Sequence, residues 1–69
     1  MSGAYTIRHM EHRAASLEVR AYELSKQAQA FRNLKLLASA DALQQRANQC
    51  DESALFWRAK IAEALSHAA

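Results

Sequence analysis

Apolar residues recur at alternating intervals of three and four along the first half of the chain, and this spacing constrains the fold most strongly. It places them on one side of a helix, as in the seam of a coiled coil or a helical bundle. From Tyr5 to Gln49 no Gly or Pro interrupts the helix. The pattern therefore predicts an all-α fold. We call the residues that carry it the seam: Ile7, Met10, Ala14, Leu17, Ala21, Leu24, Ala28 and Phe31.

The helix boundaries are marked by polar residues. The clearest break is the polar run at residues 48–53, where Asp51 can cap a new helix. We therefore predict a long helix over about 5–49 and a short C-terminal helix over about 52–67, folded as a helical hairpin in one domain, 1–69. Weaker breaks at Asn33 and at residues 39–41 leave open whether the long helix bends at either place.

A second apolar stripe, Leu36, Ala40, Leu43, Ala47 and Cys50, follows the seam. A helix over 52–67 would span roughly 24 Å, which covers this stripe but leaves the seam open. Soluble proteins avoid exposing so long an apolar surface, and chains this small often oligomerise. We therefore predict that the seam pairs two copies in a homodimeric helical bundle, with parallel and antiparallel orientations both open.

Composition argues against several functional classes. One Gly, no Pro and one Cys provide no phosphate-binding loop, no internal disulfide and none of the loops that serine catalysis needs. The chain lacks the long apolar run of a membrane span, and charged residues stand where a signal peptide has its apolar region. We therefore expect a cytoplasmic protein that is not an enzyme, does not enter a membrane and has no small-molecule substrate.

The metal-ligating residue types are few. His9 and His12 lie one helical turn apart, but a structural zinc site takes four ligands and a catalytic one usually three. A site shared across a dimer is the alternative. Cys50 falls on the second stripe and precedes Asp51 and Glu52, which disfavour a thiolate. We expect no metal ion or other cofactor, and a buried, unreactive Cys50.

The positive charge is modest and uneven. The net charge is +2: residues 1–35 carry six Lys or Arg against three Glu, whereas residues 36–69 carry three against four Asp or Glu. Basic residues lie along the long helix, but Glu11, Glu18 and Glu23 interrupt them, unlike the dense basic blocks of a basic-zipper helix. We do not expect direct nucleic-acid binding. A nucleic-acid-binding regulator and a structural assembly subunit are the alternative functions.

Five residues are candidates for binding a partner protein. Val19, Tyr22 and Phe56 are apolar, yet they fall outside the stripes that the short helix can cover, and Arg20 and Lys26 lie beside the first two. Aromatic and Arg side chains are the usual anchors of protein interfaces. We predict that these five residues form the partner-binding surface. The alternative, that they pack against a dimer mate, stays open, as does the face that binds.

Two segments carry a resemblance to a known class of protein. They are residues 30–37, Ala-Phe-Arg-Asn-Leu-Lys-Leu-Leu, and residues 54–63, Ala-Leu-Phe-Trp-Arg-Ala-Lys-Ile-Ala-Glu. With them and its length, the whole chain resembles a small bacteriophage-encoded quorum-sensing anti-activator, although no functional residue can be carried over. The resemblance implies a helical dimer in the host cytoplasm that keeps a LuxR-type transcriptional activator from DNA. It also implies inhibition of the type IV pilus assembly ATPase.

Overall fold

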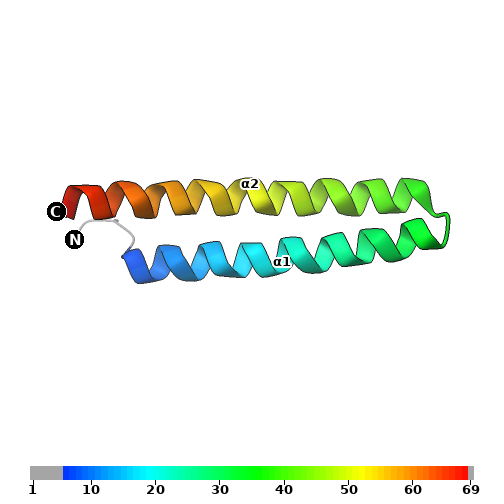
Figure 1. The fold of residues 1–69 in the computed structure, drawn as a ribbon, viewed down its shortest axis with the longest axis horizontal. Helices are drawn as coiled ribbons and strands as arrows, with labels where there is room; N and C mark the ends of the chain where they lie inside the picture. Colours follow the sequence, from blue (N-terminus) through cyan, green and yellow to red (C-terminus); the bar gives the residue numbers. More distant parts are fainter. Residues whose placement is uncertain (1–5, 69) are drawn as a thin grey trace.

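The computed structural model describes residues 6–68, and it shows a hairpin of two antiparallel α-helices (Figure 1). Helix α1 spans Ile7–Asn33 and helix α2 spans Leu37–Ala68, with a short turn between them. The molecule is 51 Å long and 14 Å thick, so it is a single layer in which both helices expose two faces. The predicted all-α helical hairpin is confirmed.

Helix α1 begins at a capped residue. The extended Thr6 precedes it, and the Thr6 hydroxyl oxygen accepts a hydrogen bond of 3.0 Å from the His9 backbone N–H. A side-chain oxygen at this position satisfies one of the backbone donors that the first helical turn leaves free. The start of the helix is therefore set locally by the sequence.

The predicted boundary at residues 48–53 is wrong. Asp51 lies inside α2 and is exposed, and the chain turns instead after Asn33, one of the two weaker breaks. The resulting helices of 27 and 32 residues are long enough to cover each other. A turn near Asp51 would have left the seam in water. Packing thus outweighed a local capping preference, because tertiary contacts provide most of a helix's stability in proteins.

The turn is a Schellman motif built around Lys35. This residue adopts a left-handed conformation with φ of 64°. Its N–H donates to the carbonyl of Arg32 at 2.9 Å, and the N–H of Leu36 donates to the carbonyl of Phe31 at 2.9 Å. These two bonds close the last turn of α1. Lys35 stands where the next seam residue would fall, so the interruption of the seam marks the turn.

We expect Lys35→Gly to stabilise the hairpin by about 0.5–1 kcal/mol, because a Cβ atom disfavours the left-handed conformation and Gly has none. For a chain of this size the melting temperature should rise by about 4 °C. Thermal unfolding followed by circular dichroism measures it. Lys35→Ala is the matched control, since it removes the charge and keeps the Cβ. An equal rise in both variants would contradict this explanation.

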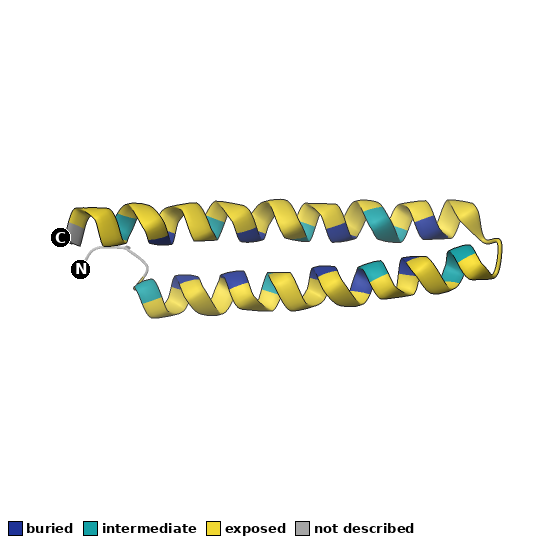
Figure 2. Ribbon diagram, in the orientation of Figure 1, coloured by how far each residue is buried: buried dark blue, intermediate teal, exposed yellow. Residues whose placement is uncertain are grey.

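Small side chains dominate the interface between the helices. The buried positions, dark blue in Figure 2, lie along the sides of the two ribbons that face each other. Small residues at the contact let two helices approach closely, so the larger side chains at the edges of the contact are only partly covered. Leu17, Leu43 and Trp57 are half-buried for this reason. The buried residues are Met10, Ala14, Ala21, Leu24, Ala28, Ala40, Ala47, Ala54 and Ile61.

The seam is an interface within one chain. Five of its eight residues are among the buried residues above, and Ile7, Leu17 and Phe31 are half-buried. Helix α2 of the same chain covers the seam, because it extends along the whole of α1. A second copy is therefore not needed to cover the seam, and the dimer seam predicted from the sequence is an intramolecular contact. Dimerisation itself stays a prediction.

Candidate protein-binding surfaces

Four cationic side chains lie along one face of the hairpin, which we call the basic face: Arg13 and Arg20 on α1, and Arg46 and Lys60 on α2. The two on each helix are separated by whole multiples of seven residues, so they point to the same side. Three surface grooves are lined by residues of this face. The basic face therefore combines positive charge with surface grooves.

The middle of the basic face holds two adjoining grooves. One, of about 190 Å³, has the half-buried Leu17 and Cys50 in its floor. The other, of about 300 Å³, continues toward Gln27. Arg20 and Arg46 line both, one from each helix. A partner lying here would contact the apolar floor and two guanidinium groups together.

The end of the hairpin opposite the turn holds a larger groove of about 450 Å³. Met10 and Trp57 lie in its lining, and the Phe56 ring packs edge-on against Trp57 with centroids 5.5 Å apart. The guanidinium carbon of Arg13 lies 5.9 Å from the centroid of the Trp57 ring, and Nζ of Lys60 lies 5.6 Å from that of Phe56. Such cation–π contacts hold the aromatic side chains in place. The groove offers an apolar pocket with a basic rim.

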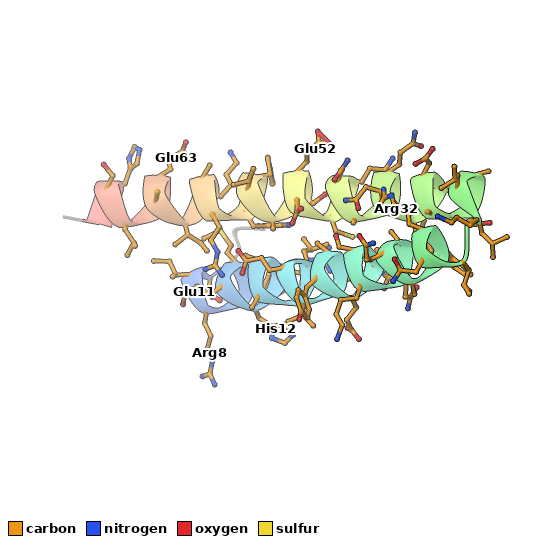
Figure 3. All side chains as sticks on the ribbon, turned by 45° about the vertical axis from the view of Figure 1, so that its right-hand side comes forward. Arg8, Glu11, His12, Arg32, Glu52 and Glu63 are labelled. Carbon is orange, nitrogen blue, oxygen red and sulfur yellow. The ribbon has the colours of Figure 1, made fainter. Side chains whose placement is uncertain are left out.

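The cations of the basic face have no carboxylate partners within the described part of the chain. The two ion pairs among residues 6–67 both involve other side chains. Glu23 and Glu63 line the same grooves but lie beyond the 4.0 Å limit of an ion pair. In Figure 3 Glu63 points away from α1, toward the outer side of α2. The positive charge of this face is therefore available to a partner.

The opposite face of the hairpin carries the ion pairs between the helices. Arg58 of α2 binds Glu18 of α1 with two hydrogen bonds, Nη2 to Oε1 at 2.8 Å and Nε to Oε2 at 3.1 Å. Arg32, which points toward α2 in Figure 3, lies with its Nη2 4.0 Å from Oδ1 of Asp41. The charges of this face are thus largely matched within the chain, unlike those of the basic face.

The pair formed by Glu18 and Arg58 is detectable by titration. The hydrogen bonds from Arg58 lower the pKa of the Glu18 carboxyl below its ordinary value, and its charge acts in the same direction. Because the folded-state pKa is the lower one, the stabilisation is fully present above the unfolded-state pKa and is lost as the pH falls through the folded-state pKa. We expect Arg58→Met to raise the pKa of Glu18, measured by NMR. An unchanged pKa would contradict the pair in solution.

The five predicted binding residues do not form one surface. Val19, Tyr22 and Phe56 are all more than half exposed, as expected for residues that the core does not need. Nζ of Lys26 lies 5.4 Å from the Tyr22 ring centroid, and with Val19 this pair follows one outer stripe of α1. Arg20 and Phe56 line separate grooves of the basic face. The prediction therefore divides into two candidate surfaces.

The exposed leucines at the turn were not singled out from the sequence. Leu34, Leu36 and Leu37 are 65%, 48% and 58% exposed. The apolar spacing places Leu36 on the second stripe of a long continuous helix. In the hairpin these residues lie at the turn, where α2 cannot cover them. The sequence feature that indicates this turn, and hence the exposure of these leucines, is the interruption of the seam at Lys35.

The candidate ligands and the thiol are dispersed. Within residues 6–68 no group of three or more His, Cys, Asp or Glu is placed to hold a metal ion. The His9 ring lies edge-on to Trp57, with centroids 6.4 Å apart. Cys50 is half-buried in the floor of the middle groove, so it is less buried than expected. His12 is exposed on α1.

Neither described helix has a stretch long and apolar enough to cross a membrane. Comparisons with protein families, with curated proteins and with solved structures found no match for this chain.

Proposed function

We propose that this chain is a small protein-binding inhibitor or adaptor that acts in the cytoplasm by occluding a larger regulatory protein. The observation that supports it is the basic face, where cations without carboxylate partners border half-buried apolar side chains. Interfaces combine an apolar centre with such Arg and aromatic anchors. The proposal assigns the chain no catalytic role and no cofactor. The resemblance in the sequence makes a LuxR-type transcriptional activator the first partner to test, and the type IV pilus assembly ATPase the second.

The thin core supports a role that is completed by a partner. Among residues 6–67, six of the nine buried side chains are Ala, and no large side chain is fully buried. A single core in a chain of this size rarely supplies more than about 3–5 kcal/mol. A partner that covers Leu17 and Trp57 would stabilise the hairpin as it binds, because ligand binding to the folded state adds to its stability.

A homodimer belongs to this proposal as well. The outer stripe of α1 offers Val19 and Tyr22, 58% and 64% exposed, as a contact that does not use the seam. Sedimentation equilibrium at micromolar concentration should then give about twice the 7.7 kDa chain mass. A monomeric mass would contradict the homodimer. It would not contradict partner binding, because the basic face lies within one chain.

The proposed function is tested with a purified LuxR-type activator bound to fluorescently labelled operator DNA. Adding the protein should release the DNA, seen as a fall in fluorescence anisotropy. Phe56→Ala should weaken the effect at least tenfold without changing the melting temperature, since truncating an interface anchor costs about 2 kcal/mol or more. Leu55→Ala is the matched control, because Leu55 is also more than half exposed but points about 100° away around the helix axis.

Tyr22→Ala in the same assay tests the outer stripe of α1 instead. Full activity of both aromatic variants would mean that neither candidate surface binds this activator. Failure of the wild-type protein to bind the activator and the ATPase would contradict the proposed partners. Direct binding of the protein to the DNA, weakening steeply with salt, would favour the nucleic-acid-binding alternative.

A further inference from the structure

We propose that the basic face receives one amphipathic α-helix of the partner, with apolar residues on its buried side and Asp or Glu along both flanks. This inference rests on the proposed function and adds the chemistry of the partner. The bound helix would lie between α1 and α2 and complete a three-helix arrangement. Three observations support it: the grooves of the basic face, the spacing of its cations, and the poorer fit of a second copy of the chain or a nucleic acid.

The floor of the basic face repeats at helical spacing. Its residues recur every seven positions on each helix, so they run along the contact between α1 and α2. From Met10 to Gln27 the lining of the three grooves extends roughly 25 Å along α1, the length of a helix of about 17 residues. The apolar residues of the floor are Met10, Leu17, Leu24, Cys50, Trp57 and Ala64.

The row of grooves between the two antiparallel helices, which we call the channel, suits a third helix lying along it. Side chains that recur at i, i+3, i+4 and i+7 on a partner helix would fill the channel as anchors do in helix-in-groove recognition. The groove at Trp57 and Met10, about 450 Å³ in volume, can take a large apolar side chain. The Arg13 guanidinium carbon, 5.9 Å from the centroid of the Trp57 ring, places a positive charge beside this groove.

The cations lie on both sides of the channel. Arg13 and Arg20 lie along the α1 side, and Arg46 and Lys60 along the α2 side. A helix in the channel would therefore meet positive charge along both flanks, at intervals of seven residues or a multiple of seven. Carboxylates at the corresponding flanking positions would match this charge, as flanking charges specify pairing in coiled coils.

Two competing occupants fit this face less well. A second copy docked symmetrically would bring Arg20 and Arg46 of both chains together, which like-charge repulsion disfavours. A nucleic acid binds mainly through its phosphates, which would leave the apolar floor of Leu17, Cys50 and Trp57 unfilled. An acidic amphipathic helix would place apolar side chains on the floor and carboxylates beside the cations.

The experiment uses two synthetic helical peptides of about 18 residues without Trp. Both carry Leu along one face, and they differ only in Glu or Lys at the flanking positions. The chain has one Trp, and Trp57 lies in the groove, so its fluorescence reports binding directly. We expect the Glu peptide to bind with at least tenfold higher affinity than the Lys peptide, and its affinity to fall with added salt.

The variants locate the binding site. Arg20→Glu combined with Arg46→Glu should weaken binding of the Glu peptide at least tenfold. Arg8→Glu combined with Lys26→Glu is the control, because it changes the net charge equally while Arg8 points away from α2 in Figure 3 and Lys26 lies on the outer stripe of α1. Circular dichroism checks that both variants keep the helical fold.

Several results would overturn the inference: no binding of the Glu peptide, equal or tighter binding of the Lys peptide, or equal losses in the two double variants. If the Arg20 and Arg46 double variant kept full affinity for the regulatory protein, the inference would fail and the proposed function would stand. If the Glu peptide bound the basic face but no regulatory protein bound, the proposed function would fail and the assignment of this face would stand.

Discussion

Replacing Leu24 with Glu is expected to unfold the hairpin at 25 °C. Leu24 is only 7% exposed and lies between the two helices. Losing the burial of the Leu side chain and moving a carboxylate into this contact together cost several kcal/mol, even with Arg20 and Arg46 in the neighbouring grooves. This equals or exceeds the roughly 3–5 kcal/mol that a core of this size provides. Circular dichroism should show the loss of most of the helical signal.

The control and the concentration dependence separate two explanations. Tyr22→Glu, at a position 64% exposed on the same helix, should leave the helical signal unchanged. If Leu24 lay in a dimer seam instead, raising the protein concentration would restore helicity in Leu24→Glu. In the hairpin the loss is independent of concentration, because the contact lies within one chain. A folded Leu24→Glu monomer would contradict the structure.

Replacing Ala21 with Leu is expected to destabilise the hairpin by about 1–3 kcal/mol, as overpacking does in close-packed cores. Ala21 is buried at 3% exposure, and the helices pack through Ala side chains along most of their contact. The larger side chain must push α1 and α2 apart or force unfavourable side-chain conformations. The melting temperature should fall by about 5 °C or more, measured by thermal unfolding.

Ala15→Leu is the matched control for this prediction. Ala15 is exposed on α1, and the same substitution there changes helix propensity equally without touching the interface. It should leave the melting temperature within about 2 °C of the wild type. Equal effects at both positions would show that the Ala contacts do not set the distance between the helices.

Part of the candidate site could be predicted from the sequence. Val19, Tyr22 and Phe56 were identified because they fall outside the apolar pattern, and they are exposed in the structure. The basic face could not be assembled in this way. Arg46 and Lys60 were not selected, because their position beside Arg20 and Arg13 depends on which residues of α2 lie against α1, and this pairing follows only once the turn is placed.

The sequence by itself determined the helical class, the side of α1 that is buried and the hairpin topology. Spacing of three and four and the absence of helix-breaking residues fix these locally. Only the tertiary structure decided where the chain turns. The polar run around Asp51 has the stronger capping signal, but the turn at Lys35 lets α2 cover the seam along its length. Burying the seam within one chain stabilises the fold more than a favourable cap does. The turn therefore forms at Lys35 and not near Asp51.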